Sequence, residues 1–352
     1  MVKRVLNLIV PIMALVSVTS CNKGNIEVSN KAVVNIAFAP INSTSVASPG
    51  LQPATKASGT NHGNSTFDAE VQTLQIFAFN SNGSLDAYTS QSGSPIALKS
   101  GNTPVSFNIT VSKGSKTIYA IANSHDLAQF ASIKTLSELE AKVSSLKSEN
   151  ARNFFMLGKA TQNITSDITV NIELNRLVSR VELLSLQTAF TGGYAGLPLT
   201  DVKVYLINVN PNTSISTGLG SGTKLNQNAL VPADTVGCAM SSMLGTSLPN
   251  ITGTAYTTPN YFYCYANSDA SAKTMLVIEG KLNSQLYYYP IVITDAPGAT
   301  YMLSRNMTYE ISNMIITRPG SDRPDIEVEK GAVSLTLTVK DWTKKSYATI
   351  TI

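Results

Sequence analysis

The residues that could carry out catalysis are few and poorly placed for it. Ser124, His125 and Asp126 have the side-chain types of a hydrolytic triad, but they are consecutive in the chain. Three neighbours in a turn cannot face one another as a nucleophile, a base and an orienting acid must, and no nucleophile elbow accompanies them. We therefore predict a turn or a helix N-cap at this position, and we predict that the protein is not an enzyme.

Metal and cofactor chemistry has equally little support. The chain has only two histidines and no Cys/His cluster, which argues against a dedicated zinc site. Asp322, Asp325, Glu327 and Glu329 could offer oxygen ligands to calcium, but they lack EF-hand spacing, so a solvated loop is the expected structure. The sequence predicts no cofactor and no metal.

Two other features leave alternatives open. Cys238 and Cys264 could form a disulfide in an oxidising compartment, or both could be buried apolar side chains. Trp342 could serve an adhesin as a surface on which a sugar stacks. Because Trp342 ends an alternating strand, a core or junction position is the favoured interpretation.

Cys21 is the residue whose surroundings indicate a covalent modification. Lys3 and Arg4 precede an apolar stretch, Val5 to Val18, which is shorter than the roughly 20 residues of a bilayer span. Small residues then lead to Cys21, so residues 1–20 resemble a lipoprotein signal peptide after which the Cys21 thiol is lipidated. The alternative is an ordinary secretory signal with an incidental cysteine. Both alternatives predict export.

Composition favours a β-rich exported protein. Charged residues make up 14% of the 352 residues, and the net charge of +4 comes with no Lys/Arg cluster, so nucleic acid is not an expected partner. The length is sufficient for two domains with cores of their own. Short alternating strands separated by turn signals predict an all-β fold, with one or a few short helices, in two β-sandwiches.

The first and last predicted strands stand apart from this pattern. Residues 32–39 form an isolated strand with Val34, Ile36 and Phe38 on one face, followed by a long turn-rich segment from Pro40 to Asn64. A loop of that length usually has a function. The last strand, residues 347–352, places Ala348, Ile350 and Ile352 on one face.

The remaining strands follow one another in two series, one on each side of residue 175. A capping box, Thr135 and Glu138, begins a predicted helix whose apolar residues continue at helical spacing to Leu146, and this helix is expected to cover one face or end of the first sandwich. Asn82 and Gly83 predict a turn after the strand that ends near Phe79.

Several segments, in the same order along nearly the whole chain, resemble the fimbrillin family, the FimA-type major subunits of type V pili in Bacteroidales. The segments are residues 21–23, 116–124, 275–282, 288–292, 305–311, 318–325 and 337–342. The last three are the most specific. The resemblance implies two tandem transthyretin-like β-sandwich domains and a structural role as a pilin.

The family's assembly mechanism gives roles to the unusual strands. Such pilins are exported as lipoproteins, and a protease then cuts the loop after the first strand. The resemblance implies that the strand bearing Val34, Ile36 and Phe38 leaves with the lipid. It further implies that the donor residues Ala348, Ile350 and Ile352 of a neighbouring copy fill the groove. A head-to-tail contact of this kind generates a filament.

The cleavage site departs from the best-known members, which are cut after arginine. No arginine lies between Arg4 and Arg152, so Lys56 in the turn-rich segment is the predicted site, with cleavage between Lys56 and Ala57. The predicted organisation is a signal peptide (1–20), a propeptide with the removable strand (21–56), an N-terminal sandwich (57–175) and a C-terminal sandwich ending in the donor strand (176–352). If Lys56 is instead a solvated loop lysine, the protein keeps its lipid.

The sequence therefore predicts a cell-surface fimbrial subunit serving adhesion or biofilm formation, with a precursor anchored to the outer membrane by lipid. Its expected partners are other copies of itself, accessory anchor and tip subunits, and a maturation protease. Two alternatives remain. One is a lipid-retaining anchor or tip subunit. The other is a glycan-binding surface lipoprotein of the outer membrane, which would present exposed aromatic platforms and retain Cys21.

Overall fold

The structure is a computed structural model of the 352-residue chain. It describes residues 30–38, 70–93, 96–100, 103–104, 106–149, 153–226, 241–296, 300–328, 332–341 and 347–351. Strands dominate these residues and the α-helices are short, so the predicted all-β fold class is confirmed. None of the helices in the described part of the chain has the length and hydropathy needed to cross a membrane.

Two facing sheets form the first part of the fold. One has the order β10-β1-β6 and the other β11-β9-β7-β2-β3, and one cluster of buried residues includes side chains from both. Their strands, with the small β4–β5 hairpin, are β1 (Lys31–Phe38), β2 (Thr73–Asn80), β3 (Leu85–Ser92), β4 (Lys99–Ser100), β5 (Thr103–Pro104), β6 (Ser106–Ser112), β7 (Gly114–Ala122), β9 (Met156–Ile164), β10 (Ile168–Ile172) and β11 (Asn175–Arg176).

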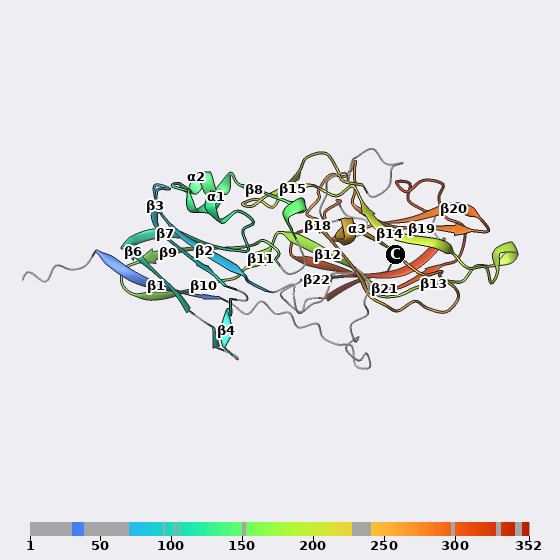
Figure 1. Cartoon of the computed structure of the whole chain (residues 1–352), viewed down its shortest axis with the longest axis horizontal. Coiled ribbons are helices and arrows are strands. Elements are labelled where there is room, and N and C mark those ends of the chain that lie inside the picture. The colour runs from blue at the N-terminus through green and yellow to red at the C-terminus, as the bar shows by residue number, and fades with distance from the viewer. Residues whose placement is uncertain are drawn as a thin grey trace, which may run out of the picture. The chain divides into compact units, whose positions relative to one another are not determined.

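Within the five-stranded sheet, β2 is buried on both faces. On β2, Leu74 and Ile76 point toward the β1 sheet, whereas Phe77 and Phe79 belong to a second core cluster that also holds Phe130 and other helical residues. In Figure 1 this sheet accordingly lies between the β1 sheet and the two helices. A strand covered on both faces needs apolar residues at successive positions, which explains the apolar run of residues 76–79 in β2.

Two short helices cover the outer face of this sheet, and both begin at side-chain caps. Asp126 caps α1 (Leu127–Ala131) by accepting a hydrogen bond from the Gln129 backbone N–H, so the predicted N-cap is confirmed. The predicted capping box of Thr135 and Glu138 is also present, at the start of α2 (Leu136–Glu140). These two caps satisfy backbone N–H groups that a helix end leaves without a partner.

The predicted continuation of α2 to Leu146 is wrong. The helix ends at Glu140, and Val143 lies in β8 (Val143–Ser145), where it pairs with Ser214 of β15. Leu146 begins a 3₁₀ turn, η1 (Leu146–Ser148), and is fully buried there. The helix does not continue because pairing of β8 with a distant segment replaces the helical hydrogen bonds, and of the two residues beyond the helix Leu146 is buried whereas Val143 is exposed.

The rest of the chain forms two larger sheets. The order of one is β18-β12-β21-β22-β23, with β13 also paired to β21, and the order of the other is β17-β14-β19-β20. Their elements are β12 (Val178–Leu183), β13 (Leu186–Thr188), η2 (Gly192–Tyr194), β14 (Thr200–Ile207), α3 (Ser241–Leu244), β17 (Gly245–Ser247), β18 (Asn260–Tyr265), β19 (Met275–Leu282), β20 (Gln285–Val292), β21 (Met307–Ile316), β22 (Val333–Asp341) and β23 (Tyr347–Thr351).

A small sheet connects the two series of strands. It has the order β16-β15-β8, so β8 from the first series pairs with β15 (Asn212–Ser214), which in turn pairs with β16 (Gly220–Ser221). Beside it, the buried Glu149 carboxylate accepts hydrogen bonds from the Tyr265 hydroxyl and the Phe155 backbone N–H, both at 2.9 Å. Residues 31–352 form one compact unit, and the division at residues 175 and 176 stays a prediction.

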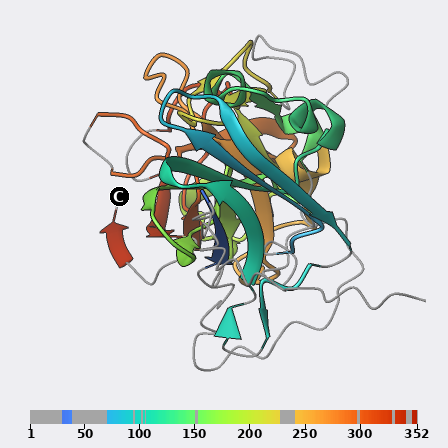
Figure 2. The same ribbon diagram turned by 90° about the vertical axis from the view of Figure 1, so that its left-hand side faces the viewer.

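The last strand lies at the edge of its sheet. β23 pairs with β22 alone, in an antiparallel register that places Thr351 opposite Thr336 and Tyr347 opposite Lys340. Figure 2 shows β23 as the red arrow at the outer side of the ribbon, beside the C-terminal label. Its second row of backbone hydrogen-bonding groups pairs with no described strand, which is the usual feature of a strand that can be added to or removed from a sheet.

Candidate functional site

The first strand is held between two strands that come much later in the chain. β1 pairs antiparallel with β6, from Lys31 opposite Ser112 to Ala37 opposite Ser106, and parallel with β10, from Val34 opposite Ile168 to Phe38 opposite Ile172. We call the space between β6 and β10, together with the side chains beneath it, the β1 slot. β1 is the strand that joins β6 and β10 in one sheet, so without it each of the two would expose an edge.

The predicted removable residues lie together on the inner face of β1. Val34 and Ile36 are 0% exposed and Phe38 is 1% exposed, so all three are inside the core. They belong to the same buried cluster as residues of β2, β7 and β9 on the facing sheet. Burial of three such side chains contributes roughly 5–9 kcal/mol, taking about 1.5–3 kcal/mol for each. Removing β1 would therefore open a large apolar surface in the core.

Specific contacts fix β1 at both of its ends. At the far end, the rings of Phe38 and Phe107 meet edge to face, with 5.5 Å between their centroids. At the near end, the backbone N–H of Val33 donates a hydrogen bond of 2.8 Å to Oδ1 of Asp167, the residue just before β10. Asp167 thus extends the ladder between the two strands by one hydrogen bond, through its side chain.

The facing sheet approaches the slot very closely at one position. A Cβ atom added to Gly158 of β9 would lie 2.3 Å from Cγ2 of Ile172 and 2.6 Å from the backbone carbonyl oxygen of Glu173. These distances are shorter than any van der Waals contact, so only glycine fits there without displacing backbone. The end of β10 can therefore lie this close to the facing sheet only because residue 158 is a glycine.

The other residues of the predicted maturation pathway are less directly described. The structure places Ala348 and Ile350 in β23, which pairs with β22 and not with the strands of the slot. Cys21, Lys56, Ala57 and Ile352 lie outside the described residues. The structure thus brings Val34, Ile36 and Phe38 together and leaves lipidation, cleavage and the donor role as predictions.

The residues considered for catalysis hold the fold together locally. The Ser124 hydroxyl donates a hydrogen bond of 2.6 Å to Oε1 of Gln75, and His125 Nε2 lies 3.4 Å from Oε2 of Glu149. Asp126 caps α1, as described above. The three side chains therefore engage three different partners and do not form a triad.

Two of the four acidic residues considered for calcium, Asp325 and Glu327, make ion pairs instead, and Asp322 is exposed. Asp325 forms a two-point contact with Arg323, at 2.9 Å from Nε and 2.7 Å from Nη2, and the pKa of its carboxyl is lowered mainly by that hydrogen bond. Glu327 lies 3.4 Å from Nζ of Lys273. Glu329, Trp342 and Cys238 lie outside the described residues, whereas Cys264 is a buried free thiol on β18.

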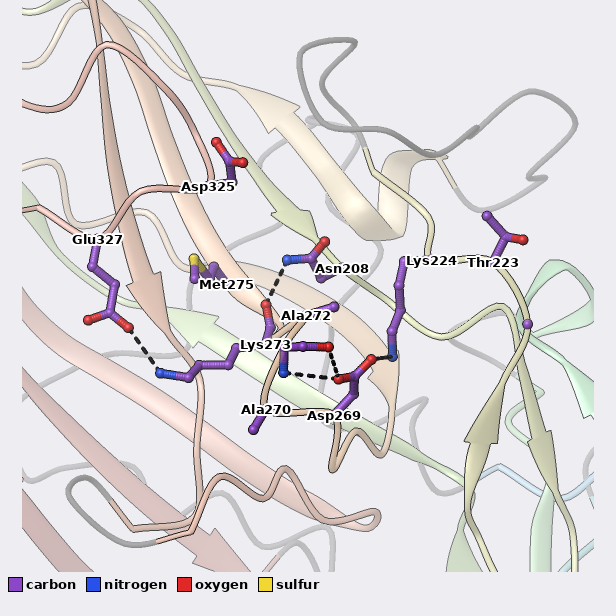
Figure 3. A pocket seen from close by; sticks show the side chains of 12 residues that line it. Asn208, Thr223, Lys224, Asp269, Ala270, Ala272, Lys273, Met275, Asp325 and Glu327 are labelled. Carbon is purple, nitrogen blue, oxygen red and sulfur yellow. Dashed lines mark hydrogen bonds and ion pairs between the residues drawn. The ribbon is translucent and has the colours of Figure 1, made fainter.

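A polar pocket of about 680 Å³ lies elsewhere among the described residues (Figure 3). Its lining includes Lys224, Asp269, Lys273 and Glu327 around a floor that contains Met275. No aromatic side chain lies among the described residues that line it. The pocket therefore presents charges and small side chains rather than the aromatic platform that the glycan-binding alternative predicts.

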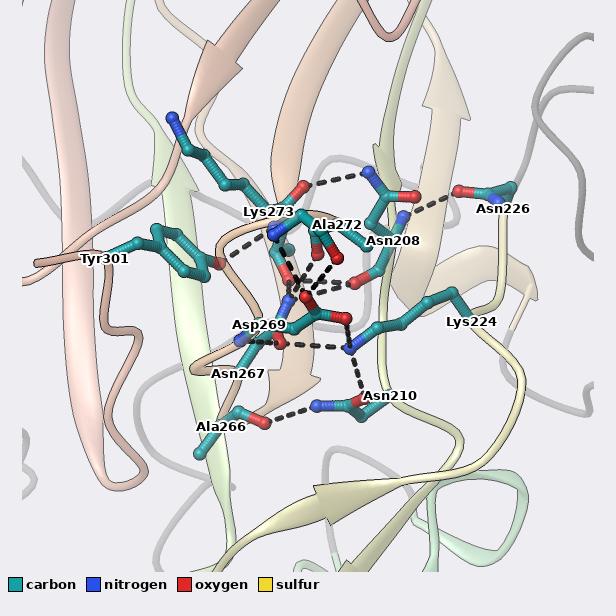
Figure 4. A network of polar contacts seen from close by, with 12 residues as sticks. Asn208, Asn210, Lys224, Asn226, Ala266, Asn267, Asp269, Ala272, Lys273 and Tyr301 are labelled. Atoms are coloured by element: carbon teal, nitrogen blue, oxygen red, sulfur yellow. Dashed lines mark hydrogen bonds and ion pairs between the residues drawn. The ribbon is translucent and has the colours of Figure 1, made fainter.

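Hydrogen bonds beneath this pocket fix its shape (Figure 4). Nζ of Lys224 donates to Oδ1 of Asn210 at 2.7 Å and to Oδ1 of Asn267 at 3.0 Å, and burial lowers the pKa of this lysine. The amide of Asn267 donates to the Ala272 carbonyl and to the Thr274 hydroxyl, at 2.8 and 3.0 Å. These groups are hydrogen-bonded to one another and join three loops, so their role is structural.

Sequence reasoning did not identify the partners of β1. Nothing local in the sequence indicates that residues 168–172 pair with β1 in parallel, because that pairing joins segments more than a hundred residues apart. The role of Asp167 was missed for the same reason. A signal was available only in the alternating apolar residues of β6 and β10, which predict strands but not their neighbours.

Comparison with known proteins identifies the class of fold. A family model described as Major fimbrial subunit protein (FimA) matches residues 43–176. The structure of a fimbrilin (FimA) from Porphyromonas gingivalis W83 covers 90% of this chain and 98% of its own, with a TM-score of 0.58 and 15% identity. No curated protein matches the sequence.

Two further solved structures show the same architecture. A candidate cell adhesion protein from Bacteroides eggerthii DSM 20697 has a TM-score of 0.64 and 20% identity, over 89% of this chain and 96% of its own. One from Parabacteroides distasonis ATCC 8503 has a TM-score of 0.58 and 17% identity, over 88% and 97%. At these identities the structures establish a shared fold. Together with the family match, they confirm the resemblance to the fimbrillin family.

Proposed function

We propose that the protein is a structural pilin of a type V fimbria, made as a lipidated precursor and polymerised by strand exchange. In this proposal Cys21 carries the lipid, and a protease cuts between Lys56 and Ala57. The propeptide then leaves the β1 slot, and the C-terminal strand of another copy replaces it. The working protein is part of a cell-surface filament, with anchor and tip subunits as accessory partners, and performs no catalysis.

The observation that carries the proposal is the position of β1 in the fold. β1 is the central strand of its sheet and is completely buried on its inner face, yet its chain connects to the rest of the described fold only through residues 39–69. One cut in that segment separates β1 from the remaining protein without interrupting another described element. A central strand that can be released in this way is suited to replacement by another chain, with main-chain hydrogen bonds giving affinity and side-chain pockets giving specificity.

The energetics of the proposal favour exchange over simple loss. Losing Val34, Ile36 and Phe38 exposes apolar surface worth roughly 5–9 kcal/mol, so the trimmed subunit is unstable until another strand enters. A donor strand with alternating apolar residues recovers much of this free energy across the junction between two copies. Because the donor and the slot belong to different parts of the same chain, each copy can both give and receive a strand.

Limited digestion of the purified precursor tests this proposal. Treatment with a lysine-specific protease is expected to yield a product beginning at Ala57 that polymerises. On a gel, the polymers should appear as ladders of oligomer bands that resist heating in detergent. Lys56→Gln should remain an intact monomer under the same treatment, while Lys113→Gln, which removes a lysine of the described surface, should behave as the unmodified protein. A trimmed product that stays monomeric would contradict the proposal, and a lipidated protein that keeps residues 21–56 on cells would favour the anchor or tip alternative.

A further inference from the structure

The residues of β1 and of the C-terminal strand match position by position in one register. Resting on the strand exchange proposed above, we propose that Ala348, Ile350 and Ile352 of one copy occupy the places of Ala32, Val34 and Ile36 in the β1 slot of the next copy. The incoming strand would run in the direction of β1, antiparallel to β6 and parallel to β10. The partner is therefore a second copy of this chain, in a defined alignment.

The inward-facing positions support this alignment. Ala32 is 3% exposed, so its place accepts a small side chain, and Ala348 supplies the same residue. Ile352 repeats Ile36, which is 0% exposed. Ile350 differs from Val34 by one added methylene, the smallest possible increase in size. Cores tolerate substitutions best when volume and shape are nearly conserved.

The outward-facing positions support it independently. Thr349 would take the place of Val33, which has the same branched shape and is half-buried, and Thr351 would take the half-buried place of Asn35. Tyr347 would lie at the position of Lys31, which is exposed and has room for a large side chain. No position in this register therefore puts a larger polar group into a buried place.

The competing alignment is shifted by two residues, since a shift of one would turn the apolar residues to the wrong face. In the shifted register Ala348 would replace Val34 and leave a void in the core. Thr351 would replace Ala37, which is 6% exposed, and bury a hydroxyl there. Ile352 would replace Phe38 and lose the edge-to-face contact with Phe107. Voids and buried hydroxyl groups both destabilise a core.

The proposed register has one consequence of its own. None of the three donor residues reaches the place of Phe38, at the end of β1 where the ring of Phe107 lies. The proposed junction therefore places its closest matches at Ala32, Val34 and Ile36. The shifted register would put Ile352 at the place of Phe38 and Ala348 at the place of Val34, so the two alignments can be distinguished by cross-linking.

Disulfide trapping between copies tests the register. Val33 lies opposite Thr110 and Asn35 lies opposite Asn108, and both residues of β6 are exposed. Trimmed Thr349→Cys protein is mixed with trimmed Thr110→Cys or Asn108→Cys protein, allowed to polymerise and oxidised, and the linked peptides are measured by mass spectrometry. The two β6 positions are two residues apart, so they form the same kind of pair across an antiparallel ladder.

The proposed register predicts that residue 349 links to residue 110 at least about tenfold more than to residue 108. Two residues along a strand correspond to about 6.6 Å, which moves the wrong pair outside disulfide range. More linkage to residue 108 would overturn the register and leave strand exchange intact. Ladders without linkage to either residue would show that the donor does not occupy this slot, and the absence of ladders would contradict the proposed function itself. Untrimmed mixtures are the control and should link to neither.

Discussion

Replacing Ile36 by alanine should destabilise the precursor but leave the filament unchanged. Ile36 is 0% exposed, lies in the middle of β1 and is paired on both sides, with Phe107 of β6 and Val170 of β10. Alanine at a closely packed site of this kind leaves a cavity that the surrounding strands cannot fill. A buried isoleucine-to-alanine change costs about 2–5 kcal/mol, so we expect a loss of that size in the precursor's free energy of unfolding.

The filament should respond differently because trimming at Lys56 removes residue 36 altogether. Ladders made from the Ile36→Ala precursor would then consist of the same chain as ladders made from the unmodified protein, and they should dissociate at the same temperature. The matched control is Ile118→Ala, because Ile118 is also 0% exposed in the same core cluster but lies on β7, which stays in the subunit. This control should destabilise both the precursor and the ladder.

The assay combines urea unfolding of the purified precursor with the dissociation temperature of ladders in detergent. The reasoning predicts a lowered urea midpoint for both variants and a lowered ladder temperature for Ile118→Ala only. If ladders from Ile36→Ala dissociate at a lower temperature than unmodified ladders, β1 remains in the filament and strand removal is refuted. If the precursor's urea midpoint does not change, the packing described for the β1 slot is wrong.

Three further predictions concern buried polar groups and are each checked by unfolding or labelling measurements. Lys116→Met should cost about 3–5 kcal/mol, because it leaves the Asp86 carboxylate, 3.2 Å from Nζ, without its ion pair. Burial alone would raise the pKa of Asp86, but hydrogen bonds from Ser112 and the Lys116 ammonium lower it below its usual value of 3.8. The unmodified protein should therefore lose stability as the pH falls below 3.8. Lys116→Met should lose less stability over the same pH range. Glu149→Gln should lower the free energy of unfolding by about 1–3 kcal/mol, because it weakens the hydrogen bonds from Tyr265 and Phe155. Tyr265→Phe removes only one of these hydrogen bonds and should cost less. Equal losses in the two variants would contradict the central role of the Glu149 carboxylate. Burial raises the pKa of the Cys264 thiol from 9.0 to about 12, so alkylation of this thiol should require unfolding. The thiol should also contribute stability that declines as the pH rises from 9.0 toward about 12. Alkylation of the native protein at pH 8 as fast as in urea would disprove the burial of this thiol.

Strands with one buried face could be predicted from the sequence, and strands with polar faces could not. The alternating residues of β1, β6 and β10 define their inner faces, and the structure buries them accordingly. β9 was missed because its middle, Lys159 to Asn163, carries polar residues that face solvent at alternate positions. β3 was missed because it is an edge strand whose residues are only half-buried or exposed. Their strand structure comes from pairing with β7 and β2, which local sequence does not encode.

The candidate site shows the same division between local and distant information. The buried residues Val34, Ile36 and Phe38 could be identified from spacing alone, because period-2 alternation places them on one face. The flanking strands, the parallel pairing with β10 and the hydrogen bond to Asp167 depend on contacts far apart in the chain. The extent of α2 was overestimated for a related reason, since β8 pairs with a segment some 70 residues further on. The capping box of Thr135 and Glu138 and the Asn82–Gly83 turn, which depend on neighbouring residues only, are present as predicted.

The most direct test of strand removal is the N-terminal sequence of the protein sheared from the cell surface. The account predicts a chain that begins at or close to Ala57 and yields no peptide from residues 31–38. A blocked, lipidated N-terminus at Cys21, with the peptide containing Val34, Ile36 and Phe38 still present in the surface protein, would contradict it.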